Sequence, residues 1–210
     1  MEKWYPRLAE VPKLGYEGSP SVDRARLPGY DARPRIERYK WDDKRRETLW
    51  WTVKGGSSSA APATQLESSP RPGESPAQTA LRHCYEALEL PGTLTDYHFI
   101  IQNTHEAIWK HRRREPWVVT ETERLCWLDL KMLEAYPKAL IFDGAGRGDE
   151  PFYPSILALY RLIRLYEQEG YLREALDVAR LAVRFKQLPR ELERLEEKIK
   201  LVEAEKEEVR

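Results

Sequence analysis

The sequence predicts an all-α protein: a small bundle of antiparallel helical hairpins that follows an N-terminal extended arm with a short β-hairpin. Beyond the first third of the chain, apolar residues recur at helical spacing, whereas the first part holds scattered aromatic residues, prolines and glycines without sustained periodicity. A stretch rich in Ser, Ala, Pro and Gly separates the two parts. We therefore infer an aromatic, proline-rich arm over residues 1–54, a flexible linker over 55–76, a helical bundle over 77–189 and a charged capping helix over 190–210.

The composition limits the partners that the chain can recruit. Its 35 Lys and Arg residues balance 35 Asp and Glu residues, so no net charge draws it to DNA or to an anionic membrane. No window approaches the run of about 20 apolar residues that a membrane span needs, and we expect a cytoplasmic protein. Cys84 and Cys126 each fall in a predicted amphipathic helix, which favours buried thiols over a disulfide framework.

The arm contains a short internal repeat. Residues 15–20 read Gly-Tyr-Glu-Gly-Ser-Pro, and residues 29–34 repeat the pattern as Gly-Tyr-Asp-Ala-Arg-Pro. Gly and Pro bend each copy in advance, and Tyr16 or Tyr30 could anchor it on a partner. The two copies are therefore candidate docking peptides, and the alternative is a pair of similar turns.

The end of the arm has the pattern of a β-hairpin. In residues 35–53, aromatic and β-branched residues flank a polar turn around Asp42. Because an isolated hairpin is marginally stable in water, we expect this one, with Trp50 and Trp51, to lie against a surface. Residues 55–76 then lack the apolar area needed to offset the entropy of ordering them, which predicts a flexible linker.

Three helices are predicted after the linker. The first begins near Gln78, and Thr95 is placed to cap a second helix that buries Phe99. Residues 120–123 read Thr-Glu-Thr-Glu, the spacing of a capping box, so we expect the third helix to begin there. The ends of the three helices are marked by Pro91, Pro116 and Pro137.

A helical hairpin is the clearest feature of the sequence. An apolar stripe at helical spacing begins at Ser155, is interrupted by Gly170, and resumes until Pro189. Because Gly170 can adopt a positive φ, the two helices can fold back and pack on each other. We expect Ala175 and Ala182 in their interface, because helices approach closely only where side chains are short.

The hairpin carries large, aromatic, turn and small residues at fixed spacing. They are Leu159, Leu162, Tyr166, Gly170, Ala175 and Ala182. With this pattern, residues 154–189 resemble a tetratricopeptide repeat, a helix–turn–helix unit of about 34 residues. The match is degenerate, because Leu159 replaces the usual Trp and Ile163 stands where a small residue is expected. The alternative is an unrelated helical bundle with one coincidental hairpin.

This resemblance implies a groove that grips a peptide, lined by the first helix of the hairpin. Carried over to this sequence, the groove residues are Tyr160, Arg164, Glu167 and Gln168. Tyr160, Arg164 and Gln168 follow one another at one helical turn and offer an aromatic ring, a guanidinium fork and an amide. The alternative is the solvated face of an amphipathic helix.

A basic cluster follows the second predicted helix. Lys110, Arg112, Arg113 and Arg114 lie close in sequence to Trp117, so cations for phosphate groups and a ring for stacking occur together. These residues form a candidate nucleic-acid site. The alternative is that the cations complement the negative end of the helix dipole.

No motif in the sequence supports catalysis or cofactor binding. The four histidines have no His-x₃-His spacing, and the two cysteines form no Cys-x₂-Cys knuckle. The glycine-rich segment 143–149 lacks the Lys-Ser/Thr of a phosphate-binding loop. We therefore assign no catalytic, cofactor-binding or metal-binding residue.

The last predicted helix is almost entirely charged apart from one stripe. Its members, in a three-four-three rhythm, are Leu192, Leu195, Ile199 and Val202. We expect this helix to cover the end of the preceding hairpin, as repeat bundles require for solubility. Pairing of two chains through the stripe is the alternative, and the oligomeric state is left open.

Together these observations favour a non-enzymatic adaptor or complex subunit that binds a protein or peptide. Partner contacts are expected from the helical groove and from the tethered arm, in particular from Tyr16, Tyr30, Trp50 and Trp51. The arm holds too many aromatic side chains to leave in water without purpose: Trp4, Tyr5, Tyr16, Tyr30, Trp41, Trp50 and Trp51. The alternative is a nucleic-acid-associated subunit that uses the Lys, Arg and Trp clusters.

Overall fold

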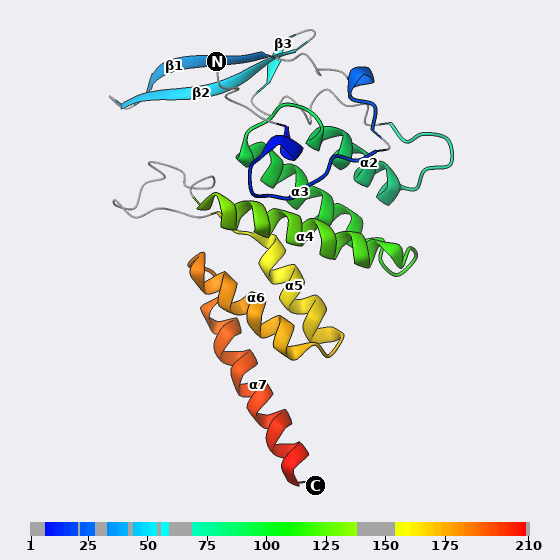
Figure 1. Ribbon diagram of the computed structural model, residues 1–210, viewed down its shortest axis with the longest axis vertical. Coiled ribbons are helices and arrows are strands. Elements are labelled where there is room, and N and C mark those ends of the chain that lie inside the picture. The colour runs from blue at the N-terminus through cyan, green and yellow to red at the C-terminus, as the bar shows by residue number, and fades with distance from the viewer. Residues whose placement is uncertain are drawn as a thin grey trace. The chain divides into compact units, whose positions relative to one another are not determined.

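In the computed structural model the chain divides into two compact units, Met1–Ala135 and Tyr136–Arg210 (Figure 1). The structure describes residues 7–20, 22–27, 33–41, 44–53, 56–58, 69–137 and 154–208; within residues 33–58 and 206–208 it describes the backbone alone.

The helical part of the described chain consists of six α-helices that pack as sequential antiparallel pairs (Figure 1). In the first unit, α3 packs against both α2 and α4, and in the second, α6 packs against both α5 and α7. Short 3₁₀ helices, η1 (Leu8–Glu10) and η2 (Arg24–Arg26), precede them. The α-helices are α2 (Pro76–Leu88), α3 (Leu94–Trp109), α4 (Trp117–Ala135), α5 (Leu157–Gln168), α6 (Leu172–Arg184) and α7 (Pro189–Glu208).

A small antiparallel sheet occupies the segment in which the sequence predicts a hairpin. The strands are β1 (Arg33–Trp41), β2 (Lys44–Val53) and β3 (Gly56–Ser58), in the order β1-β2-β3. Arg35 stands opposite Trp50 in the register of β1 and β2. The sequence pattern predicted two strands and did not predict β3.

The first two helices begin at capping boxes. At α2, the Ser75 hydroxyl accepts a hydrogen bond from the Gln78 amide, and the Gln78 side chain accepts one from the Ser75 amide. At α3, the reciprocal pair is Thr93 and Asp96, so the prediction that Thr95 is the cap was wrong. Thr93 is favoured because Asp96 stands three residues after it and can return the hydrogen bond.

The start of α4 also differs from the prediction. The helix begins at Trp117, so the capping-box spacing at residues 120–123 lies inside it and caps nothing. In the first turn, the Val118 amide donates a hydrogen bond to the Glu115 carbonyl, and the Val119 amide donates one to the Pro116 carbonyl. Val118 is fully buried, and its burial explains why the helix extends upstream of the expected start.

The core of the first unit lies between its three helices. Tyr97, Ile101 and Ile108 of α3 are fully buried, as are Leu125, Leu130, Met132 and Leu133 of α4. Cys84 and Cys126 are buried free thiols, which confirms that prediction. Phe99 was expected inside but is 37% exposed, because it lies off the stripe formed by residues 97, 101, 105 and 108.

The core of the second unit uses small side chains where its helices meet. Ala175 and Ala182 are both fully buried, which confirms their predicted place in the interface. Gly170 has φ +84° at the turn between α5 and α6, a conformation that other residues rarely adopt. The two helices therefore reverse direction over a very short connection.

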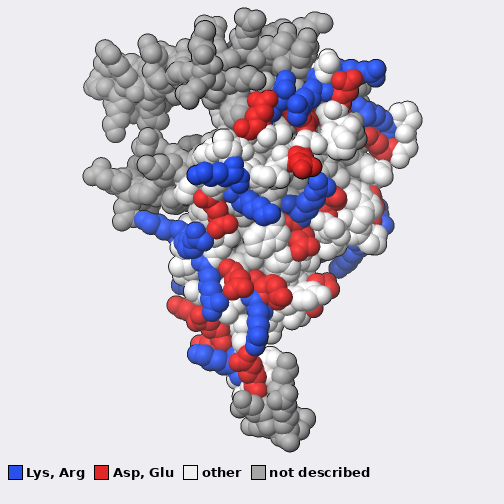
Figure 2. Space-filling view, in the orientation of Figure 1, with Lys and Arg blue, Asp and Glu red and all other residues white. Residues whose placement is uncertain are grey.

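The N-terminal segment of residues 7–27 packs into the first unit. Leu8, Val11, Leu14 and Leu27 are all buried, although the sequence around them shows no regular periodicity. None of the described helices has the length and apolarity needed to cross a membrane. On the face shown in Figure 2, cationic and anionic side chains are interspersed, as the balanced composition predicts.

Candidate interaction surfaces

The first candidate surface is the α5 face, which we define as Tyr160, Arg164, Glu167 and Gln168. Tyr160 is 41% exposed, and Arg164 and Gln168 are also exposed. The Arg164 Nε donates a hydrogen bond to the Tyr160 hydroxyl at 3.2 Å, and the guanidinium carbon lies 5.5 Å from the centre of the Tyr160 ring. The two side chains thus hold each other in one orientation, which lowers the entropy cost of using them in binding.

Glu167 differs from the other members of the α5 face, because its carboxylate is bound by α7. Arg194 donates to both carboxylate oxygens, at 2.6 and 2.7 Å, and the Lys198 ammonium donates to one at 2.7 Å. The Glu167 side chain is only 10% exposed. Glu167 therefore ties α5 to α7, while Tyr160, Arg164 and Gln168 remain at the surface.

This ion cluster changes the acidity of Glu167. The hydrogen bonds from Arg194 stabilise the charged form and lower its pKa to about 2, against an ordinary value of 4.5. Lys198 acts in the same direction, and burial opposes both. The carboxylate is therefore ionised throughout the neutral and mildly acidic range.

Of the aromatic residues predicted to dock the arm, Tyr16 is described with its side chain. Its hydroxyl oxygen is buried and has no hydrogen-bond partner among the described residues. Burial, followed by the charge of Glu89, raises the pKa of Tyr16. Tyr30 and the side chains of Trp50 and Trp51 lie outside the described residues.

The segment around Tyr16 is held by a buried carboxylate. Glu89, directly after α2, is 1% exposed and accepts a hydrogen bond from the Ser19 amide at 2.8 Å and another from Arg24. Gly18 packs so closely that a Cβ there would lie 2.6 Å from a Glu89 oxygen. A side chain at position 18 would displace the Glu89 carboxylate and the Arg24 guanidinium, so glycine favours this close approach of the backbone.

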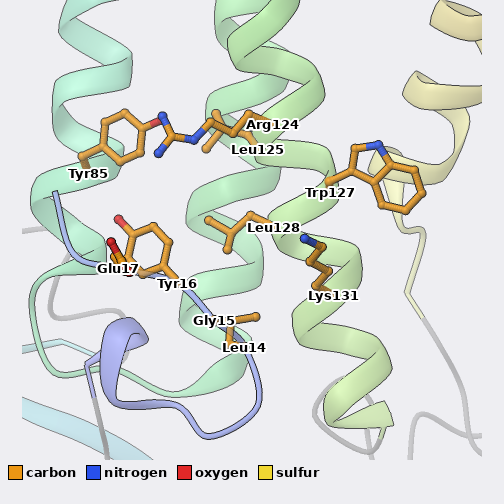
Figure 3. A pocket seen from close by; sticks show the side chains of 10 residues that line it. All are labelled: Leu14, Gly15, Tyr16, Glu17, Tyr85, Arg124, Leu125, Trp127, Leu128 and Lys131. Carbon is orange, nitrogen blue, oxygen red and sulfur yellow. The ribbon is translucent and has the colours of Figure 1, made fainter.

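A second candidate surface, the arm pocket, lies where this segment meets α2 and α4 (Figure 3). Its volume is about 360 Å³. Tyr16 and Tyr85 lie on one side of Leu128 in Figure 3, and the ammonium of Lys131 lies on the other. The pocket is lined by Leu14, Gly15, Tyr16, Glu17, Tyr85, Arg124, Leu125, Trp127, Leu128 and Lys131.

Arg124 is positioned at this pocket by neighbours on two helices. Its guanidinium carbon lies 5.5 Å from the centre of the Tyr85 ring and its nitrogen 3.7 Å from a Glu121 oxygen. Tyr85 in turn donates a hydrogen bond to Glu121 at 2.6 Å. Sequence reasoning missed Tyr85, Arg124 and Lys131, because the pocket joins residues 14–17 to helices that lie more than 60 residues further along the chain. The one sequence signal was Tyr16 itself.

The candidate nucleic-acid residues fall in the turn between α3 and α4. Lys110, Arg113 and Arg114 are exposed, whereas Arg112 stacks on Trp109 with its guanidinium carbon 4.6 Å from the ring centre. Arg112 also donates to the Trp109 carbonyl at 3.0 Å. Trp117, half-buried at the start of α4, follows the turn.

A buried His–Asp pair was not foreseen from the sequence. His98 of α3 and Asp129 of α4 are both fully buried, with Nδ1 and Oδ1 2.8 Å apart. Burial raises the pKa of Asp129, and the hydrogen bond from His98 opposes that rise. Neither residue lines the arm pocket, so we assign the pair to the packing of α3 on α4.

The described residues contain no group of three or more His, Cys, Asp or Glu placed to hold a metal ion. Comparisons of the chain with protein-family models, with curated proteins and with solved structures give no match.

The Glu167 cluster makes a prediction about acid stability. Because the pKa of Glu167 is lower in the folded chain than in the unfolded one, its contribution to stability is complete above about pH 4.5 and is lost as the pH falls toward 2. Glu167→Gln should lower the free energy of unfolding of the second unit by about 1–2 kcal/mol at neutral pH. Urea denaturation at several pH values measures both effects.

Glu203→Gln is the matched control, because Glu203 is 55% exposed and lies 3.4 Å from the exposed Arg173. This variant should change stability by less than about 0.5 kcal/mol. Equal losses in both variants, or a Glu167→Gln protein with the same pH profile as the wild type, would contradict the role of the cluster.

Proposed function

We propose that the protein is a cytoplasmic, non-enzymatic adaptor or complex subunit that binds a protein or peptide partner through the α5 face. The supporting observation is the pair formed by Tyr160 and Arg164, which are exposed yet held together by a hydrogen bond. Tyr and Arg are the residue types that contribute most often to binding energy at protein interfaces. Gln168, one turn further along α5, adds an amide that can pair with a peptide backbone.

We also propose that α5 and α6 form a tetratricopeptide-like unit that is capped by α7. Buried Leu159 and Leu162, together with the positive φ of Gly170, support this interpretation. In such a unit the first helix faces the ligand, so the α5 face would line the groove. The ion cluster at Glu167 would then fix the capping helix beside it.

The arm supplies a second contact in this proposal. Tyr30, Trp50 and Trp51 would dock on a partner while the Ser-, Ala-, Pro- and Gly-rich stretch before α2 acts as a tether, so that two weak contacts act together. Tyr16 lines the arm pocket and would contribute to binding there. The packing of the segment with Tyr16 against α2 and α4 supports the idea that such a peptide can dock on a helical surface.

The test is capture of partners from a nuclease-treated lysate with the full chain as bait. Tyr160→Ala combined with Arg164→Ala should abolish retention of at least one protein that the wild type captures. Asp177→Ala combined with Arg180→Ala is the matched control, because it removes an exposed pair from α6 and should leave capture intact. Identical capture by all three baits would refute the role of the α5 face.

A second candidate function is nucleic-acid association through the turn between α3 and α4. The supporting observation is that Lys110, Arg113 and Arg114 are exposed beside the stacked pair of Arg112 and Trp109. Cations bind phosphate groups and aromatic rings stack on bases, so the turn offers both kinds of contact. Trp117 would add a second ring.

This candidate predicts binding that weakens steeply with salt. Replacing Arg112, Arg113 and Arg114 by Ala should weaken binding of single-stranded RNA in a gel-shift titration by about tenfold or more, because each lost phosphate contact reduces both the affinity and the salt slope. The second candidate fails if the triple variant binds as the wild type does, or if affinity is the same at low and high salt.

A further inference from the structure

The arm pocket allows the chemistry of a partner to be specified. We propose that it binds an acidic peptide segment of a protein partner, with one large apolar side chain in the pocket and the adjacent carboxylates on Arg124 and Lys131. This inference rests on the proposed function, because it names the partner chemistry for a second surface of an interaction module.

The apolar part of the pocket is pre-formed. Leu125 is fully buried in the core, and Leu14 is 6% exposed, so both are fixed by their packing. A volume of about 360 Å³ is at the small end of ligand pockets, which span about 300–1,000 Å³. The space suits one large side chain with its flanking backbone better than a fully enclosed drug-sized molecule.

The charges around the pocket favour an anionic ligand. Arg124, Leu128 and Lys131 stand at positions i, i+4 and i+7 of α4, so two cations flank an apolar side chain on one helix face, about 10 Å apart along the axis. Glu121 is 3.7 Å from Arg124, too far for a normal hydrogen bond, which leaves guanidinium donors for a ligand. Among the lining residues, Glu17 is the one carboxylate against two cations, and Glu121, which lies outside the lining, accepts a hydrogen bond from the Tyr85 hydroxyl.

The residue types and exposure point to a macromolecular partner. Tyr16, Tyr85, Trp127 and Arg124 are of the kinds that form hot spots at protein interfaces. Gly15, Glu17, Arg124 and Lys131 are exposed, so the mouth lies at the surface, where a side chain presented by a large partner can enter. A small molecule would leave much of its surface in water there, whereas small-molecule sites bury most of their ligand.

The experiment is a heteronuclear NMR titration of the full chain with a short peptide in which one Phe is followed by Asp and Glu residues. The Trp127 indole and the backbone amides of residues 14–17 should shift on addition of the peptide. Arg124→Glu combined with Lys131→Glu should weaken binding by about tenfold or more, through loss of two ion pairs and added repulsion. The matched control, Arg173→Glu combined with Arg180→Glu, makes the same charge change at exposed positions of α6 and should bind as the wild type does.

Three results would overturn the inference. The first is equal binding of the peptide by the pocket variant and the wild type. The second is equal binding of either control peptide, one with Lys in place of Asp and Glu and one with Ser in place of Phe. The third is binding of phenylpropionate as tightly as the peptide, which would make the pocket a small-molecule site. If the peptide does not bind while partner capture still depends on Tyr160 and Arg164, the inference is wrong and the proposed function stands. If the peptide binds at the pocket while capture does not depend on Tyr160 and Arg164, the α5 face is not a binding surface and the pocket remains one.

Discussion

The buried carboxylate of Glu89 is the interaction on which the first unit most depends. This carboxylate accepts hydrogen bonds from the Ser19 amide and the Arg24 side chain, and Gly18 packs directly against it. Three positions of the N-terminal segment therefore contact one residue beside α2. A buried carboxylate is stable only when donors replace its water, and here the donors come from a segment without regular periodicity. Because that segment forms one wall of the arm pocket, the candidate binding surface exists only while Glu89 holds it in place.

A comparable interaction of one carboxylate with several donors organises the second unit. The Glu167 carboxylate accepts hydrogen bonds from Arg194 and Lys198. This cluster joins α5 to α7, as Glu89 joins the N-terminal segment to the end of α2. In both units a carboxylate of low exposure joins segments that are distant in sequence, while the candidate surfaces nearby combine exposed cationic side chains with aromatic side chains that are exposed or half-buried. The chain thus separates residues that fix its structure from residues that can recognise a ligand.

The sequence predicted those parts of the fold that depend on local pattern. The all-α core, the break at Gly170 and the burial of Ala175 and Ala182 follow from helical periodicity and from the conformational freedom of glycine. The start of α4 was mispredicted because burial of Val118 outweighed a local capping signal. The arm pocket, the anchor at Glu89 and the pair of His98 with Asp129 could not be predicted, because each joins residues more than 30 positions apart with no periodic relation between them.

Hydrogen exchange at the Ser19 amide tests the central claim most directly. If Glu89 holds the N-terminal segment on the helices, this amide should be protected in the full-length protein, and Glu89→Gln should speed its exchange by about tenfold or more, since a hydrogen bond to a charged group contributes about 1.5–3 kcal/mol. A Ser19 amide that exchanges in the wild type as fast as in an unstructured peptide would contradict the account.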